Sequence, residues 1–175
     1  MTASERGRGV AAADSTYLIA LGSNQRHPLF GHPRAVVETA IELLDGTLGT
    51  VVARSPVIDS APVGPSQRRY ANAALVLASR LEPLSLLDGL HEAEAAMGRE
   101  RRGQRWRSRV LDLDIVLWSG GIFAAPDLAI PHPLFRQRDF VLRPAVAIAA
   151  DWRDPVSNLS LRQLRARLRK TQVSR

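Results

Sequence analysis

Residues 98–118 read GRERRGQRWRSRVLDLDIVLW, a run rich in arginine that leads directly into a strand-like segment. The run holds one tryptophan and six arginines: Arg99, Arg101, Arg102, Arg105, Arg107 and Arg109. The strand-like segment alternates apolar and polar residues, which predicts a strand with one buried face. Asp112 and Asp114 then share the other face, roughly 6.5–7 Å apart along the chain. Because arginines bind phosphate and paired carboxylates bind divalent cations, the stretch indicates chemistry on a metal-bound polyphosphate.

The apolar pattern on both sides of this stretch predicts an alternation of strands and helices. We expect strands at residues 17–21, 50–58, 70–79 and 110–118. Helices are expected to begin at Pro33 and Pro83, and the second to stop at Gly98. The order strand, helix, strand, strand, helix, strand is the βαββαβ pattern of a ferredoxin-like sandwich, an α+β fold. Beyond it we expect an irregular segment at 119–138, a helix at 139–149 and a basic amphipathic helix at 159–170.

The length of 175 residues suits one hydrophobic core. We assign residues 1–15 to a flexible tail and residues 16–172 to a single domain, and we expect a cytoplasmic monomer without membrane contacts. No apolar run approaches the ~20 residues that cross a bilayer, and the N-terminus lacks the apolar core of a secretory signal. The chain has no cysteine, which excludes disulfides, thiolate zinc sites and a thiol nucleophile. GxxxxGK[ST] and GxGxxG motifs are absent, which argues against P-loop and Rossmann nucleotide sites.

The net charge of +7 comes almost wholly from arginine, since Lys170 is the single lysine among 24 basic residues. A GC-rich genome accounts for much of this bias, but it does not explain the cluster at 99–109. That cluster could be a solvated loop, a surface that stacks RNA or single-stranded DNA on Trp106, or a loop that closes over the triphosphate of ATP. The neighbouring aspartates favour ATP, because bare carboxylates would repel a nucleic-acid backbone.

Other polar and aromatic residues are candidates for binding, although each also has an ordinary structural interpretation. Tyr70 and Asn72 share a strand face, where they could stack on and hydrogen-bond a flat heterocycle or simply line a solvent edge. His132 lies between two prolines and could serve only a turn. Phe140 could pack in the core, and His91 could be a satisfied helix residue. The two aspartates could likewise pair with arginines.

Six segments together resemble the 6-hydroxymethyl-7,8-dihydropterin pyrophosphokinase family over about residues 17–150. The segments are ALGSN at 20–24, SAPVGP at 60–65, YANAA at 70–74, GRERR at 98–102, RVLDLDIVL at 109–117 and IPHPLFRQRDFVLRPA at 130–145. The resemblance implies a ferredoxin-like fold. It also implies transfer of the β,γ-diphosphate of ATP to the hydroxymethyl group of a reduced pterin, with release of AMP, in folate biosynthesis.

The resemblance also implies roles for individual residues, with ATP and the pterin as partners and no nucleic acid. Two Mg²⁺ ions would bind Asp112 and Asp114 and bridge the triphosphate. The implied catalytic residues are Arg99, Arg109, Asp112 and Asp114. The implied pterin-binding residues are Asn24, Ser60, Ala61, Val63, Tyr70, Asn72 and Phe140, with Tyr70 and Phe140 on the two sides of the ring. The implied nucleotide-binding residues are His91, Arg99, Arg101, Trp106, Arg109, Ile115, His132 and Arg138.

Two positions depart from the pattern of the family. Arg107-Ser108 stands where the family usually has Gly-Pro, and Pro133 stands where an aromatic or basic residue sometimes occurs. We expect loops 59–69 and 98–109 to close over the site and exclude water. Two alternatives remain at this stage: a basic module that binds RNA or single-stranded DNA, and a two-metal phosphohydrolase built on the same aspartates.

Overall fold

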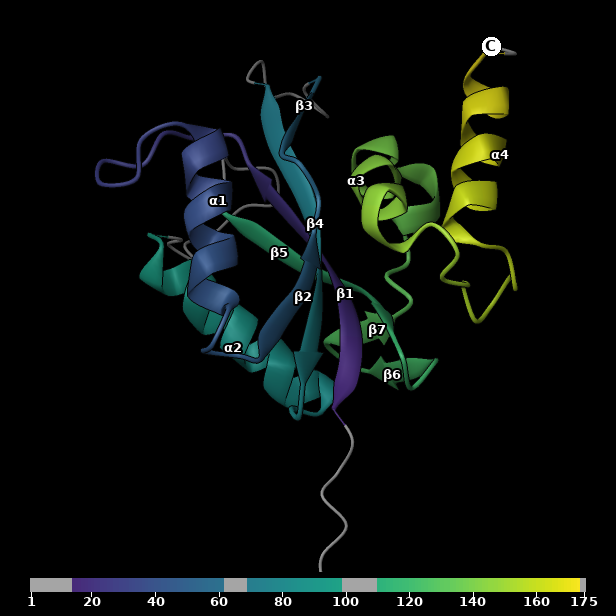
Figure 1. Ribbon diagram of the computed structural model, residues 1–175, viewed down its shortest axis with the longest axis horizontal. Coiled ribbons are helices and arrows are strands. Elements are labelled where there is room, and N and C mark those ends of the chain that lie inside the picture. Colours follow the sequence, from purple (N-terminus) through teal and green to yellow (C-terminus); the bar gives the residue numbers. More distant parts are fainter. Residues whose placement is uncertain (1–13, 62–68, 99–109, 174–175) are drawn as a thin grey trace, which may run out of the picture.

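The computed structural model describes residues 14–61, 69–98 and 110–173. The strands of the main sheet are β1 (Ser15–Ser23), β2 (Thr50–Arg54), β3 (Ile58–Ser60), β4 (Tyr70–Ser79) and β5 (Asp112–Trp118). The α-helices are α1 (Pro33–Leu44), α2 (Pro83–Ala96), α3 (Asp139–Ala149) and α4 (Leu161–Val173). Helices α1 and α2 cover one face of the sheet, whereas α3 lies on the other face with α4 packed against its outer side (Figure 1).

The main sheet is antiparallel throughout, with the strand order β2-β4-β1-β5 and with β3 paired to β4. The two long strands β1 and β4 therefore lie in the centre, and β5 is an edge strand. A second, two-stranded sheet joins β6 (Phe123–Ala125) to β7 (Leu128–Ile130). No described helix is both long enough and apolar enough to cross a bilayer.

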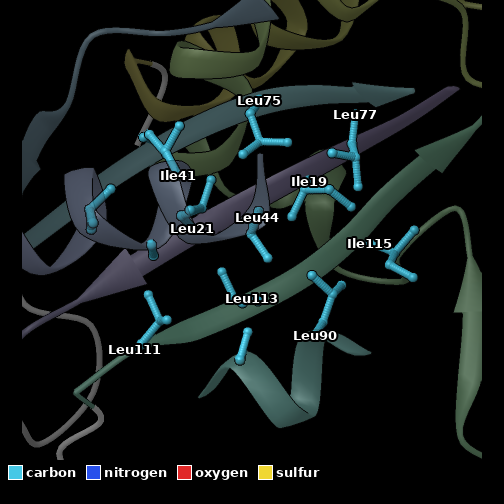
Figure 2. Close-up of a cluster of buried hydrophobic side chains, with 14 of the residues drawn as sticks. Ile19, Leu21, Ile41, Leu44, Leu75, Leu77, Leu90, Leu111, Leu113 and Ile115 are labelled. Carbon is cyan, nitrogen blue, oxygen red and sulfur yellow. The ribbon is translucent and has the colours of Figure 1, made fainter. Parts of the chain in front are cut away.

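Apolar residues fill both sides of the central strands. Between the sheet and α1 and α2 lies a core that includes Leu21, Leu44 and Leu113 (Figure 2). A second core, between the sheet and α3 and α4, includes Val76 and Leu142. Because successive side chains of a strand point to opposite faces, the nearly continuous apolar runs of β1 and β4 supply both cores.

The predicted helix boundaries are confirmed where prolines and glycines mark them. Pro33 and Pro83 occupy the first positions of α1 and α2, where the missing N–H of proline costs no hydrogen bond. Gly98 follows α2 with φ +84°, a left-handed conformation that glycine adopts without steric strain. The strand predicted at 70–79 is confirmed with the same bounds, and the helix predicted at 139–149 is α3.

Three predictions of secondary structure were wrong in part. The strand expected at 50–58 is divided into β2 and β3, because Pro56 has no N–H for the ladder and the Ser55 hydroxyl instead accepts a hydrogen bond from the Ala74 N–H at 3.0 Å. Strand β3 also extends into the segment expected to be a loop, 59–69. The segment 119–138, expected to be irregular, contains the β6–β7 hairpin and the 3-10 helix η1 (Phe135–Gln137). Strands of three residues are too short to show a period in the sequence.

Candidate active site

The register of the central strands brings several predicted site residues to one end of one sheet face. Gly22 of β1 lies opposite Asn72 of β4 on one side and opposite Asp112 of β5 on the other. Two residues earlier in β1, on the same face of the sheet, Ala20 lies opposite Asp114. Residues directly opposite one another project from the same face of a sheet. Asn72 and the two aspartates therefore lie on either side of Gly22 and Ala20. We call these two small residues the floor of the site.

The amide of Asn72 is held in a fixed orientation above this floor. Its Nδ2 donates a hydrogen bond to the Ser60 hydroxyl at 2.8 Å, and the side chain is almost fully buried. A Cβ added at Gly22 would lie 3.3 Å from Oδ1 of Asn72, closer than ordinary contact. The glycine therefore leaves room beside an amide oxygen that points over the floor. Asn24, which follows β1, is also buried.

Two basic side chains from outside the main sheet, those of His132 and Arg138, face Asp114. Nε2 of His132 and Nη1 of Arg138 each lie 3.9 Å from Oδ2 of Asp114. Burial lowers the pKa of His132, and Arg138 lowers it further, while Asp114 and Asp112 partly oppose this. The neutral ring accepts a hydrogen bond from the Leu134 N–H at Nδ1, at 3.2 Å. Nε2 therefore carries the proton and points toward the carboxylate.

A cavity of about 380 Å³ adjoins β5, between α2 and the β6–β7 hairpin. Its polar lining comes from His91, Glu94, Asp112, Asp114, Asp127 and His132. Its apolar lining includes Leu87, Ile115, Leu128 and Pro133. Both predicted metal ligands and three predicted nucleotide-binding residues (His91, Ile115 and His132) therefore border one cavity.

Glu94 and Asp127 line this cavity but were missed in the sequence. Glu94 is buried on α2, and its Oε1 accepts a hydrogen bond from the Leu113 N–H of the edge strand at 2.8 Å. The available signal was its position three residues after His91, which places both on one face of the helix. Asp127 lies between β6 and β7, in the hairpin that the sequence did not predict.

The two aromatic residues proposed to enclose the pterin ring come from elements that pack together. Tyr70 begins β4, and Phe140 lies in the first turn of α3, which contacts both β3 and β4. Phe140 is half-buried against the second core, so its packing interpretation also holds. The guanidinium carbon of Arg138 lies 5.8 Å from the centre of the Phe140 ring. Arg138 thus approaches both Asp114 and this ring.

Several predicted site residues lie outside the residues that the structure describes: Val63, Arg99, Arg101, Trp106 and Arg109. The same holds for Arg107-Ser108 and for most of the two loops expected to close. Of the remaining candidates, Asn24, Ser60, Ala61, Tyr70, Asn72, Phe140 and Arg138 are not among the residues lining the cavity beside β5. The roles of all these residues stay predictions.

The donor set of the site suits magnesium bound together with a polyphosphate. Across residues 14–61, 69–98 and 110–173, no group of three or more His, Asp or Glu side chains is arranged to hold a metal ion. Asp112 and Asp114 offer two carboxylates, and Mg²⁺ usually takes one or two while water and substrate phosphates complete its shell. Two carboxylates therefore fit Mg²⁺ whose remaining ligands are water and phosphate oxygens.

The chain matches the model of the 7,8-dihydro-6-hydroxymethylpterin-pyrophosphokinase family over residues 18–150. It is 39% identical over 139 residues to a 2-amino-4-hydroxy-6-hydroxymethyldihydropteridine pyrophosphokinase of Pseudomonas aeruginosa, covering 78% of this chain and 82% of that protein. It is 40% identical over 137 residues to a protein of the same name from Haemophilus influenzae, with the same two coverages.

A solved structure has a similar fold. The wild-type HPPK-DHPS of Plasmodium falciparum superposes with a TM-score of 0.70 and 14% identity, covering 88% of this chain. The chain corresponds to 44% of that longer protein, so this likeness concerns the fold alone. The family match and the two bacterial relatives decide the assignment: the chain belongs to the 7,8-dihydro-6-hydroxymethylpterin-pyrophosphokinase (HPPK) family.

Proposed function

We propose that the protein transfers the β,γ-diphosphate of ATP to the hydroxymethyl group of 6-hydroxymethyl-7,8-dihydropterin, giving AMP and the pterin diphosphate, in folate biosynthesis. Membership of the family supports this activity, and it supports neither the nucleic-acid-binding module nor the phosphohydrolase. The observation that carries the proposal to individual residues is the register that puts Asp112 opposite Gly22 and Asp114 opposite Ala20, with Asn72 across the same floor.

The fold proposed for this activity is the ferredoxin-like sandwich. In support, the strands follow the order β2-β4-β1-β5 with antiparallel pairing throughout, and each half contributes one helix, α1 or α2, to the same face. The single domain at residues 16–172, the monomeric state and the cytoplasmic location stay predictions.

The cavity beside β5 is proposed to hold the nucleoside of ATP. The Leu113 N–H points outward from the edge strand, toward Glu94. Because backbone groups alternate in direction along a strand, Ile115 presents its N–H and C=O on the same outer side. Such a pair can read the donor and acceptor edge of a base, while Leu87 and Leu128 supply apolar contacts.

Asp112 and Asp114 are proposed to hold Mg²⁺ with the triphosphate. When bound, the metal would neutralise phosphate charge and make the β-phosphorus more electrophilic. Arg138 and the Nε2–H of His132, which face Asp114, are proposed to donate hydrogen bonds to phosphate oxygens. Arg99 and Arg109 are proposed to contribute further phosphate contacts.

The pterin is proposed to bind on the other side of the carboxylates, between Tyr70 and Phe140. Asn72 would read its polar edge through Oδ1, since Ser60 already accepts a hydrogen bond from Nδ2. The backbone of loop 60–63 and Asn24 would supply the remaining contacts. This arrangement leaves the two carboxylates between the pterin and the nucleotide.

Catalysis then consists of positioning and charge stabilisation. The hydroxymethyl oxygen forms a bond to the β-phosphorus, and the bond from that phosphorus to the α,β-bridging oxygen breaks. AMP leaves with that bonding electron pair, and the hydroxyl proton passes to solvent or to a phosphate oxygen. A loose transition state needs little help from a strong base, which agrees with the absence of an obvious one among the predicted site residues.

The test is an AMP assay with Mg²⁺ and ATP, run with and without the pterin. The proposal predicts AMP in amounts equal to the pterin diphosphate, and no AMP without pterin. AMP or ADP formed without pterin would indicate hydrolysis. Failure to form AMP, together with salt-sensitive binding of oligonucleotides, would favour the nucleic-acid module.

A further inference from the structure

An ion pair joins the segment that borders the proposed site to the C-terminal part of the chain. We call residues 132–140 the site segment and residues 151–173 the C-terminal segment. Arg136 donates from Nε and Nη2 to the two carboxylate oxygens of Asp154, at 2.8 and 2.6 Å. The match to the family model ends at residue 150, so Asp154 lies beyond it.

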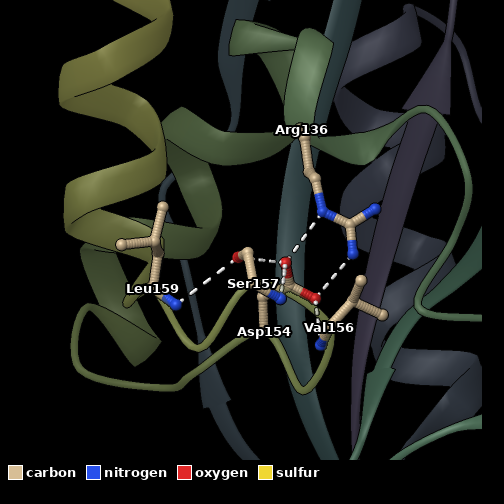
Figure 3. A network of polar contacts seen from close by, with 5 residues as sticks. All are labelled: Arg136, Asp154, Val156, Ser157 and Leu159. Carbon is tan, nitrogen blue, oxygen red and sulfur yellow. Dashed lines mark hydrogen bonds and ion pairs between the residues drawn. The ribbon is translucent and has the colours of Figure 1, made fainter.

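Asp154 is the centre of a closed polar network (Figure 3). The carboxylate is fully buried, and it also accepts hydrogen bonds from the N–H groups of Val156 and Ser157 and from the Ser157 hydroxyl. A buried carboxylate with this many donors has a fixed position. Arg136 forms two parallel hydrogen bonds with this carboxylate, so its guanidinium is held in a fixed position as well.

A second ion pair joins the same two segments near the start of α3. Nε of Arg165 on α4 donates to Oδ1 of Asp139 at 3.0 Å, and both side chains are partly buried. Helix α4 packs against α3 and against η1, so the pair is held inside an interface between helices (Figure 1). Asp139 is therefore anchored from the C-terminal segment as well.

The residues anchored by these pairs stand on either side of Arg138. Arg136 and Asp139 reach toward the C-terminal segment, whereas Arg138 reaches the other way, to 3.9 Å from Asp114. At its first residue the site segment is held to β5, where the His132 N–H donates to the Val116 carbonyl at 3.0 Å. The backbone that carries Arg138 is thus fixed from two sides.

We propose that Arg165 and Asp154 are positioning residues of the enzyme: through Asp139 and Arg136 they hold the site segment so that Arg138 meets the triphosphate of ATP. This inference rests on the proposed phosphate contact of Arg138. The C-terminal segment itself contributes no residue to the lining of the cavity beside β5. Its effect on ATP therefore passes through the site segment.

The test measures the affinity for Mg²⁺ and α,β-methylene-ATP, in which the bond broken in the reaction cannot be cleaved. Arg165→Met removes the anchoring ion pair and keeps much of the aliphatic contact on α4. The matched control is Arg162→Met on the same helix, whose pair with Asp151 at 3.3 Å is exposed and does not reach the site segment. We expect Arg165→Met to weaken binding about threefold to tenfold and Arg162→Met to leave it unchanged.

A double-mutant cycle with Arg138→Ala separates positioning from plain stabilisation. A purely structural loss lowers the melting temperature and the folded fraction, but not the affinity of the molecules that stay folded. If Arg165 acts through Arg138, then Arg165→Met costs no further affinity once Arg138 is alanine. Should Arg165→Met fail to fold, Asp139→Asn removes the same ion pair from the other side and takes its place in the cycle.

Two results would overturn the proposal. One is an unchanged affinity in folded Arg165→Met, and the other is an equal loss from Arg165→Met whether residue 138 is arginine or alanine. Arg138→Ala alone checks the role on which the inference rests. If that variant binds the analogue as tightly as the unaltered protein, the phosphate contact and the positioning proposal both fail. The AMP assay with the pterin then still tests the activity separately.

Discussion

Nη1 of Arg138 lies 3.9 Å from Oδ2 of Asp114, which is too far for a hydrogen bond. The two charges face each other across the end of the sheet without closing on one another. A cation that binds the carboxylate and an anion that binds the guanidinium would both be accommodated by this arrangement. The side chains of Asp114 and Arg138 are each about one-third exposed, so both groups remain accessible to ligands.

The first prediction concerns the two carboxylates. Asp112→Asn and Asp114→Asn should each lower the rate of diphosphate transfer by at least about 10²-fold, because the amide removes the charge that holds Mg²⁺ against the triphosphate. Circular dichroism should still show folded protein, since both side chains are partly exposed. Asp88→Asn, on the exposed side of α2, is the matched control and should keep full activity. An active Asp112→Asn protein would remove the metal assignment.

A second prediction separates the two substrates. Phe140→Ala should weaken binding of the pterin by roughly tenfold or more, because an aromatic stacking partner contributes up to about 1.5 kcal/mol beyond the area that it buries. Calorimetry should measure pterin binding in the presence of α,β-methylene-ATP, and binding of the analogue by itself. The analogue should lose much less affinity than the pterin. Equal losses for both ligands would mean that Phe140 only supports Arg138.

A third prediction concerns the floor of the site. Gly22→Ala should lower kcat/KM by about tenfold, because the new Cβ would press on Oδ1 of Asn72 and move it by a few tenths of an ångström. Ser23→Ala is the control, since Ser23 is buried and its side chain projects from the opposite face of β1. If both variants lose the same activity, the effect would come from β1 as a whole and not from the floor.

A fourth prediction follows from the ionisation of Asp154. Burial by itself would raise its pKa, but hydrogen bonds from Arg136, Ser157 and Val156 and the charge of Arg136 lower it to about 2. The folded pKa thus lies below that of the unfolded chain. The contribution of Asp154 to stability is complete above the unfolded pKa, near 4, and is lost as the pH falls toward 2.

Urea unfolding of the unaltered protein and of Asp154→Asn, at pH 5 and at pH 3, measures this contribution. The free energy of unfolding of the unaltered protein should exceed that of the variant by about 3 kcal/mol at pH 5, because the variant leaves Arg136 without its buried partner. That difference should shrink by about 1 kcal/mol at pH 3. A difference that does not change with pH would show that Asp154 is not a depressed carboxylate.

The sequence predicted the elements of this fold better than their pairing. Period-two alternation around Asp112 and prolines at the starts of α1 and α2 are local signals, and the elements that they predict are present. The register that puts Gly22 between Asn72 and Asp112 depends on contacts between residues about 50 and 90 positions apart in the chain, and no local pattern encodes it. The resemblance to the family, and not the pattern, brought these residues together in advance.

Buried polar groups were the least predictable part of the site. In the sequence, Glu94 looks like an ordinary surface acid of a helix. In the fold it accepts a hydrogen bond from the Leu113 N–H of the edge strand β5. Asp154 likewise lies in a turn whose sequence gives no sign of Arg136, 18 residues earlier. In both cases the partner is a group that only the tertiary fold brings near, so the physical reason for the charge is invisible in a single sequence.

The most direct test of the proposed site is a crystal structure with Mg²⁺, α,β-methylene-ATP and the pterin bound together. We expect Mg²⁺ in contact with Asp112 and Asp114, the adenosine in the cavity beside β5, and the hydroxymethyl oxygen in line with the β-phosphorus. A complex in which both aspartates lack metal, or in which the pterin oxygen faces away from that phosphorus, would contradict it.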